Sequence, residues 1–215
     1  MTSIKIQVAN ESHLGYVNDI LTNIEESAKA RGTGIAKRTP EYVETKIREG
    51  KAIIALEENK FVGFCYIETW GHGKFVANSG LIVSPDYRGQ GVAKDIKRAT
   101  FKLSRTRYPD AKIFGLTTGL AVMKINSSLG YRPVTFSELT DDEAFWHGCK
   151  SCVNFDILTR TERKHCLCTG MLFNPAWETG KVEPPKKKHP LNVYARWFKV
   201  NYIRLTKLRN GKKGK

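Results

Sequence analysis

The chain has 215 residues, of which 40% are hydrophobic and 10% aromatic, enough to bury a core, so a wholly disordered chain is excluded. No stretch approaches the roughly 18–20 apolar residues of a membrane-spanning helix, and the first residues lack a secretory-signal pattern. We therefore expect a cytoplasmic protein with no membrane partner. The net charge of +15 is unevenly spread, since residues 181–215 carry +11 and residues 1–180 only +4.

Apolar periodicity and turn residues predict an alternation of strands and helices along the first 134 residues. In chain order the expected elements are a strand at 4–8, helices at 11–28 and 40–49, strands at 51–57, 61–69 and 75–84, a helix at 91–105, a strand at 112–118, a helix at 120–129 and a returning strand after Gly130. Thr39 is the expected N-cap of the second helix. The parallel crossover in the second half predicts an α/β (α+β) fold with a mixed, mostly antiparallel twisted sheet flanked by helices.

The junction between the strand at 75–84 and the helix at 91–105 is the most informative segment. Pro85 ends the strand, and the glycine-containing run Arg88-Gly89-Gln90-Gly91-Val92-Ala93 leads directly into the helix. Such a loop turns backbone N–H groups toward one point, and the helix start adds unpaired donors and a positive dipole end. The segment therefore predicts an anion site suited to a pyrophosphate.

This junction resembles the Q/R-x-x-G-x-G/A signature of the Gcn5-related N-acetyltransferases (GNAT), including the preceding apolar strand and its Ser-Pro-Asp-Tyr turn. The resemblance implies a GNAT-like fold and acetyl-CoA as co-substrate. It implies that the backbone amides of Arg88, Gly89, Gln90, Gly91, Val92 and Ala93 hold the pyrophosphate. It also implies that the strand Leu81, Ile82 and Val83 pairs with the pantetheine arm, with an N–H near Ile82 or Val83 as oxyanion hole.

Four shorter segments are similar to the acetyltransferase domain of N-acetylglutamate synthases. They are Gly34–Glu44, Leu116–Thr118, Gly130–Val134 and Glu162–Lys164. This resemblance implies a small-molecule amine acceptor, an amino acid acetylated on its α-amine, with L-glutamate at the entry to arginine synthesis preferred. Because arginine suits bidentate carboxylate recognition, Arg38 and Arg163 are the predicted acceptor anchors, with surface solvation as the alternative for each. Thr117 and Thr118 of the Leu-Thr-Thr segment are further candidates.

The catalytic groups are less well defined. Many GNAT enzymes use a tyrosine four residues before the glycine of their last motif as general acid, and here that position is Asn126. Asparagine cannot supply a proton at neutral pH. For a general base, Glu68 and His72 are the candidates, acting directly or through water, although His72 between two glycines equally fits an ordinary loop.

Four cysteines occur within residues 147–168: Cys149, Cys152, Cys166 and Cys168. The C-x-x-C pair resembles a zinc knuckle, and a C-x-C pair in a strand places both sulfurs on one face. Structural zinc and buried or redox-active thiols are both open. A catalytic metal is not expected, because transfer from a thioester needs none.

The organisation expected is an acetyltransferase domain at 1–180 and a basic appendage at 181–215, in which a proline-rich linker precedes an amphipathic helix. We favour docking of this helix on the domain or on a second subunit, giving a homo-oligomer, over nucleic-acid binding. Two alternatives to the main function remain open. One is a GNAT enzyme that acts on a protein or polyamine amine or uses another acyl-CoA such as succinyl-CoA. The other is a CoA-sensing or nucleic-acid-binding module.

Overall fold

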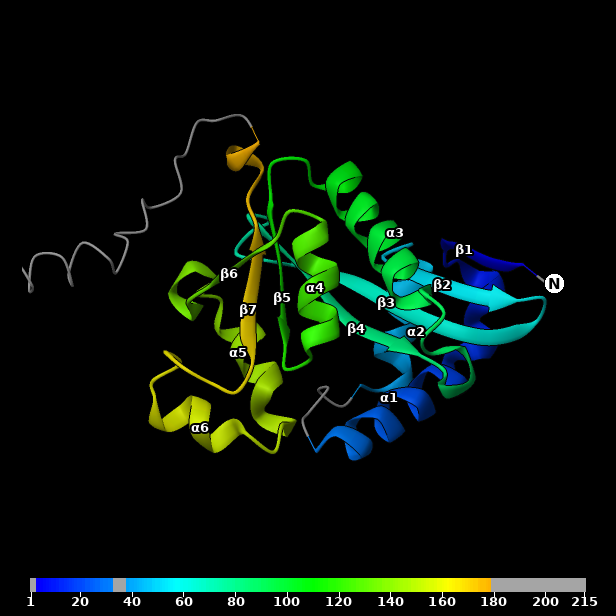
Figure 1. Ribbon diagram of the computed structural model, residues 1–215, viewed down its shortest axis with the longest axis horizontal. Helices are drawn as coiled ribbons and strands as arrows, with labels where there is room; N and C mark the ends of the chain where they lie inside the picture. The colour runs from blue at the N-terminus through cyan, green and yellow to red at the C-terminus, as the bar shows by residue number, and fades with distance from the viewer. Residues whose placement is uncertain (1–2, 33–37, 179–215) are drawn as a thin grey trace, which may run out of the picture. The chain divides into compact units, whose positions relative to one another are not determined.

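The computed structural model describes residues 3–32 and 38–178, and those up to Pro175 form one compact unit built on a seven-stranded sheet (Figure 1). The strand order is β1-β2-β3-β4-β5-β7-β6. The strands are β1 (Ile4–Val8), β2 (Ala52–Glu57), β3 (Lys60–Trp70), β4 (Phe75–Val83), β5 (Lys112–Thr117), β6 (Arg132–Val134) and β7 (Thr169–Phe173). The α-helices are α1 (Val17–Arg31), α2 (Pro40–Arg48), α3 (Val92–Arg107), α4 (Leu120–Ser128), α5 (Glu143–His147) and α6 (Phe155–Arg160).

Alternation along the buried strands divides the helices between the two faces of the sheet. Ala52, Ile54 and Leu56 of β2 pack with α1 and α2, whereas Ile53 and Ala55 pack with α3. A third cluster, around Ile113, joins β5 and β7 to α3 and α4. The sheet is therefore covered by α1 and α2 on one face and by α3 and α4 on the other (Figure 1).

The two central strands, β4 and β5, form the only parallel pair of the described sheet, and they stay paired over a short distance. Phe75, Val76 and Ala77 pair with residues 112–114, and from Asn78 onward the two strands separate. Beyond this point β4 contains a bulge, because the register with β3 shifts between Phe64 and Tyr66. Gly80 lies in the bulge with φ +66°, a backbone conformation that residues other than glycine rarely adopt. The separation and the bulge together open a gap near the middle of the sheet.

The predicted elements up to residue 134 are confirmed, with small shifts of their ends. Thr39 caps α2 as expected, since its Oγ1 accepts a hydrogen bond from the Tyr42 N–H (3.3 Å). The first predicted helix differs because residues 11–16 form a 3₁₀ turn before α1 begins. The C-x-C pair is wrongly predicted as a strand: Cys166 and Cys168 precede β7, which begins at Thr169.

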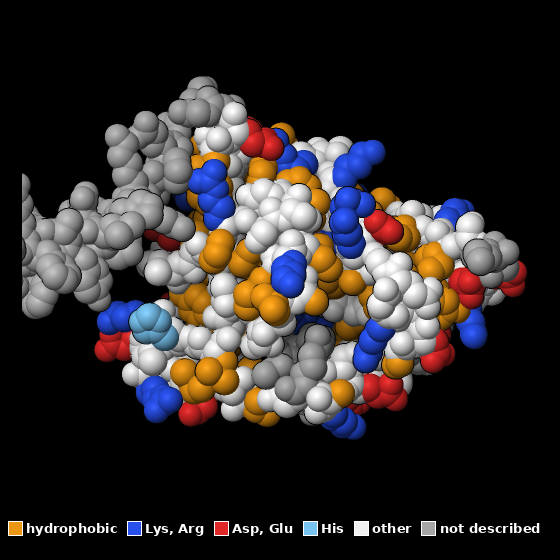
Figure 2. Space-filling model, viewed as in Figure 1, with side chains coloured by type: hydrophobic (Ala, Val, Ile, Leu, Met, Phe, Trp, Pro, Cys, Tyr) orange, Lys and Arg blue, Asp and Glu red, His pale blue; other side chains and the backbone are white. Residues whose placement is uncertain are grey.

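The linker and helix predicted for 181–215, and part of the predicted Gly34–Glu44 segment, lie outside the described residues. Within the part of the chain that the structure covers, no helix is long and apolar enough to cross a bilayer. On the face shown in Figure 2, Lys and Arg side chains are scattered among Asp and Glu rather than gathered in one patch. This pattern fits the small net charge of residues 1–180.

Candidate functional site

The predicted pyrophosphate loop is built as a turn that presents the start of α3. Gly89 (φ +78°) and Gly91 (φ +86°) both adopt left-handed conformations, and a Cβ placed on either would meet open space. The N–H groups of Lys94 and Asp95 are bonded to the Gly91 carbonyl. The first-turn amides of Val92 and Ala93 precede these bonds and point out of the helix start. The loop thus combines space and unpaired donors, as an anion site requires.

Two side chains hold this loop in place. Arg88 Nε donates to the Val83 carbonyl at the end of β4 (3.1 Å), and Arg88 Nη2 donates to Ser27 Oγ on α1 (3.3 Å). Gln90 Nε2 donates to the Asp86 carbonyl (3.0 Å). These side-chain bonds tie the loop to β4, α1 and the preceding turn. The predicted role of the Arg88 amide is wrong, because the Arg88 N–H is bonded to the Pro85 carbonyl (3.2 Å), whereas no backbone acceptor among the described residues pairs with the N–H groups of residues 89–91.

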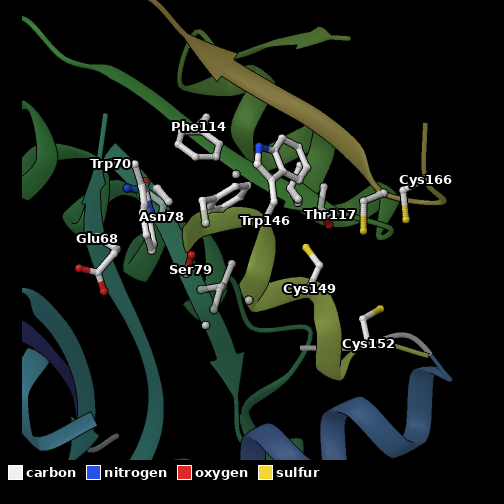
Figure 3. Close-up of a pocket in the computed structure, with 18 of the residues that line it drawn as sticks. Glu68, Trp70, Asn78, Ser79, Phe114, Thr117, Trp146, Cys149, Cys152 and Cys166 are labelled. Atoms are coloured by element: carbon white, nitrogen blue, oxygen red, sulfur yellow. The ribbon is translucent and has the colours of Figure 1, made fainter. Parts of the chain in front are cut away.

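A cavity of about 490 Å³ runs through the gap between β4 and β5. From one face of the sheet it is lined by Arg38, just before the N-cap of α2, and by Tyr42 of α2. From the other face it is lined by Lys97 of α3 and Asn126 of α4. Figure 3 shows Asn78 and Ser79 on β4, with Glu68 to one side and the labelled cysteines to the other. A molecule in this cavity can be approached from both faces of the sheet.

Arg38 is fixed at the α2 side of the cavity by two tyrosines. Its Nε donates to the Tyr66 hydroxyl (2.7 Å), and its guanidinium lies over the rings of Tyr42 and Tyr66, at 5.1 and 5.8 Å from their centroids. Burial raises the pKa of Tyr66, and the Arg38 charge opposes that shift. The tyrosines place a cation at the cavity wall in one orientation.

Glu68 also lines the cavity, but its charge is already balanced. Glu68 Oε2 accepts hydrogen bonds from Lys46 Nζ (2.6 Å) and from the Tyr42 hydroxyl (2.5 Å), and the Lys46 side chain is only 8% exposed. Burial raises the pKa of Tyr42, so the phenol stays protonated. As a general base, Glu68 would have to act from within this ion pair.

On the opposite face, Lys97 is buried without a carboxylate partner among the described residues. It is 2% exposed, its Nζ donates to Asn78 Oδ1 (3.0 Å), and its charge lies 5.2 Å from the centre of the Tyr131 ring. Asn78 Oδ1 also accepts from the Tyr131 hydroxyl (2.8 Å), while Asn78 Nδ2 donates to Ser104 Oγ (2.8 Å). Burial lowers the pKa of Lys97 to about 8.

A buried polar atom without a partner lies on the same side. Asn126, at the position where many GNAT enzymes carry tyrosine, is 2% exposed, and its Oδ1 accepts no hydrogen bond from the described residues. An unpaired buried acceptor costs about 1–3 kcal/mol. Since Asn126 lines the cavity, a bound amide N–H would remove this cost.

The connection between β6 and β7, residues 135–168, supplies the remaining wall. Its aromatic side chains stack at the sheet, with Phe145 packed edge-on against Trp70 (5.6 Å) and Phe114 (4.9 Å). Trp146 is anchored by its Nε1 donating to the Thr140 carbonyl (2.8 Å). These contacts hold short helices that would not be stable alone.

The four predicted zinc ligands all line this wall, but they do not form a metal site. No group of three or more His, Cys, Asp or Glu side chains within residues 3–32 and 38–178 is placed to hold a metal ion. Burial, reinforced by neighbouring thiols, raises the pKa of Cys149 to about 11 and that of Cys168 to about 12. Cys152 Sγ accepts from the Asn154 N–H (3.5 Å). Cys149 and Cys168 are therefore held as neutral thiols.

The other predicted site residues are distributed as follows. Thr117, Thr118 and Leu81 line the cavity, together with Arg38 and Glu68. Ile82 and Val83 pair with β3 along one edge of β4, and the irregular backbone of β4 lies earlier, at Gly80 and Leu81. Along the other edge β5 pairs only with residues 75–77, so the pairing of Leu81–Val83 with a pantetheine arm stays a prediction.

Two of the predicted residues lie away from the cavity. His72 is exposed in the turn after β3, with φ +55°. Arg163 follows α6 rather than adjoining β7, and its Nη1 donates to Glu143 Oε1 on the surface (2.6 Å). The structure therefore does not bring Arg163 to Arg38.

Lys97, Tyr42 and the aromatic wall around Trp146 were not predicted as parts of the site. A signal for Lys97 exists, because the buried side chains of α3 include Lys97, Thr100 and Ser104 at helical spacing. Lysine side chains on a helix are normally exposed, so the spacing alone did not predict that Lys97 is buried.

Comparisons with known proteins agree with this geometry. The model of the acetyltransferase (GNAT) family matches residues 21–119. No curated protein sequence matches the chain.

Among solved structures, N-acetylglutamate synthase from Neisseria gonorrhoeae, complexed with coenzyme A and N-acetyl-glutamate, superposes with a TM-score of 0.57 at 14% identity over 81% of this chain. This chain spans about a third (35%) of that synthase. Rv2747 from Mycobacterium tuberculosis, complexed with CoA, gives a TM-score of 0.56 at 15% identity, covering 79% of this chain and 98% of its own. Diaminobutyrate acetyltransferase EctA from Paenibacillus lautus gives 0.55 at 10% identity, covering 81% and 96%. At these identities the likeness concerns the fold.

Proposed function

We propose that the chain is a GNAT-type acetyltransferase that uses acetyl-CoA, as the family model over residues 21–119 supports, and that it acetylates the α-amine of a small amino acid that carries a carboxylate, with L-glutamate preferred. The observation that carries the proposal is Arg38, a cation fixed by Tyr66 at the cavity wall. Formation of N-acetylglutamate would place the reaction at the entry to arginine synthesis, as the resemblance to N-acetylglutamate synthases implies.

The charges around the cavity favour an anionic acceptor. Among the described residues that line it, Arg38 and Lys97 are cationic, and Glu68 is the one carboxylate. Glu68 is neutralised by Lys46. A polyamine or lysine acceptor is better served by an acidic cleft, whereas a dicarboxylic amino acid needs fixed cations. The sequence resemblance and the synthase from Neisseria gonorrhoeae support the same choice.

The described residues fit acetyl-CoA at two places. The open loop around Gly91 offers amides to the pyrophosphate, and Asn126 Oδ1 offers an acceptor to an amide N–H of the pantetheine arm. Since the loop and Asn126 both belong to the α3 and α4 face, the donor would enter there. The acceptor would then enter from the α2 face, beside Arg38, and meet the thioester in the gap.

In this arrangement the chain contributes mainly position and electrostatics. Arg38 orients the acceptor carboxylate, and the bulge at Gly80 and Leu81 exposes backbone that can polarise the thioester carbonyl. Holding amine and thioester together in a site walled by Trp70 and Trp146 removes much of the entropic barrier.

The test is an acceptor panel that removes one carboxylate at a time. Glutamate, glutamine and γ-aminobutyrate are offered with acetyl-CoA or succinyl-CoA, and release of free thiol is measured. Glutamate with acetyl-CoA is expected to give the highest kcat/KM. Higher activity on a polyamine, a peptide amine or with succinyl-CoA would replace the proposal with that alternative.

Arg38→Ala is expected to lower kcat/KM for glutamate about 10²-fold while leaving the KM for acetyl-CoA nearly unchanged, since a charge-assisted pair contributes about 1.5–3 kcal/mol. Arg48→Ala, on the exposed side of α2, serves as the matched control. Equal effects of Arg38→Ala on both substrates would reject Arg38 as the acceptor anchor.

A further inference from the structure

Lys97 is a buried charge at the cavity to which the proposed function gives no part in the reaction. It lies on α3, whose N-terminus carries the predicted pyrophosphate loop, and it lines the cavity on that face. A buried ammonium without a carboxylate is costly, so its presence in a core position calls for an explanation. A purely structural role does not account for it, because the bond to Asn78 Oδ1 is the one hydrogen bond that the described residues give Lys97 Nζ, and two of its three N–H donors are left over.

The position of Lys97 relative to the gap defines what it can act on. Its partner Asn78 is the β4 residue at which β4 and β5 part. Asn126, at the position of the general acid in many GNAT enzymes, lines the same cavity from α4. If the acceptor attacks from the Arg38 side, the leaving group departs toward the opposite face, where Lys97 and Asn126 lie.

We propose that the Lys97 ammonium stabilises the CoA thiolate as it leaves and gives it a proton, in place of the tyrosine that is absent at position 126. This inference rests on the proposed binding of acetyl-CoA in the gap and concerns the same site. It does not depend on which amine is the acceptor.

The neutral amine attacks the thioester carbon, the C–N bond forms, and the carbonyl becomes an oxyanion. When the carbonyl re-forms, the C–S bond breaks and its electron pair stays on sulfur. A proton passes from Lys97 Nζ to the sulfur, giving the free thiol, and the proton released by the acylated nitrogen returns Lys97 to its charged form through water or the neighbouring groups.

The groups that face Lys97 are suited to this role. Tyr131 and Cys65, the titratable side chains around it, are both held neutral, since burial raises the pKa of each. The lowered pKa of Lys97, about 8, lies near that of an ordinary thiol, as efficient proton transfer requires. Asn78 and Ser104 complete the shell without adding charge.

The first test measures the bound product and needs no acceptor. The thiolate absorbance of bound CoA is titrated against pH, with desulfo-CoA as the blank, in the wild type and in Lys97→Met. The wild type is expected to lower the pKa of the bound thiol by one unit or more relative to Lys97→Met. Lys102→Met, exposed on the same helix, should match the wild type. Equal thiol pKa values in wild type and Lys97→Met would overturn the proposal.

The second test uses Asn78→Asp, which places a carboxylate beside Lys97 without changing the shape of the side chain. The carboxylate should raise the Lys97 pKa and shift the alkaline limb of kcat upward by about one unit. Lys97→Met should lose that limb and fall about 10²-fold in kcat, with little change in the affinity for acetyl-CoA. An alkaline limb that stays in place in both variants would overturn the role of Lys97.

The two proposals fail in distinguishable ways. If CoA does not bind to the wild type, the assignment of the gap to acetyl-CoA fails. If CoA binds but its thiol titrates alike in the wild type and in Lys97→Met, only the role of Lys97 fails.

Discussion

Replacing Lys97 by methionine should make the protein more stable at neutral pH, although it removes a charged residue from a hydrogen bond. Methionine has nearly the same length and no charge to bury. The pKa of Lys97 falls from 10.5 to about 8 on folding, a shift that corresponds to a cost of about 3 kcal/mol for keeping the ammonium charged in the folded state. Removing this cost stabilises the variant, and loss of the hydrogen bond to Asn78 destabilises it by about 1 kcal/mol. A net stabilisation of about 2 kcal/mol is expected.

The stability advantage of Lys97→Met over the wild type should disappear as the pH rises. Below pH 8 the lysine is protonated in both states, and the whole burial cost is present. Between pH 8 and 10.5 the folded state binds fewer protons than the unfolded state, so the wild type becomes more stable with increasing pH while Lys97→Met does not follow. By pH 9.5 the advantage of the variant should have fallen by about 2 kcal/mol, close to zero.

Urea unfolding at pH 7 and pH 9.5, comparing wild type and variant at each pH, measures this difference. In thermal unfolding at pH 7, Lys97→Met is expected to raise the Tm by roughly 4–8 °C for a chain of this size. Lys102→Met controls for general charge effects, because Lys102 is exposed on the same helix. A variant that is less stable than the wild type at pH 7, or a difference that does not change with pH, would refute the reasoning.

Three further predictions concern the loop, the bulge and the thiols. Gly91→Glu should abolish acetyl-CoA binding in calorimetry by placing a charge at the anion site and forcing φ +86° on a side chain; wild-type affinity would contradict the assignment of the loop. Gly80→Ala should cost about 2–3 kcal/mol in urea unfolding and raise the acceptor KM, since its Cβ would lie 2.6 Å from Tyr66 Cε1, on the ring that holds Arg38; no change in either quantity speaks against this packing. At pH 7 Cys149 should react with iodoacetamide about 10²-fold more slowly than a free thiol, because its pKa is raised to about 11; peptide mass spectrometry would detect fast labelling, which would contradict the burial of this thiol.

The sheet up to β6 was predictable because local patterns decide it. Ala52 to Glu57 alternate between two covered faces, and Thr39 with Pro40 marks a helix start that the structure confirms. The predicted loop at Gly89 and Gly91 adopts the positive φ angles that glycine permits. In each case the residue type and its spacing are enough to predict the local structure.

The connection from β6 to β7 was not predictable for the opposite reason. Helices α5 and α6 are five and six residues long, too short for a helical period, and the aromatic contacts of Phe145 and Trp146 stabilise α5 across the fold. Lys97 was missed because only the tertiary structure shows that its ammonium is buried beside Asn78.

The long connection between β6 and β7 separates the cavity wall, along the chain, from the predicted pyrophosphate loop. Residues 135–168 supply part of the cavity wall from one continuous segment, whereas the loop proposed to hold the donor lies between β4 and α3. In the proposed arrangement, exchange of this segment would reshape one wall of the cavity while Arg38 and the loop at Gly89 and Gly91 stay unchanged. Chimeras that exchange residues 135–168 between relatives would therefore change the cavity wall and leave the rest of the fold as it is.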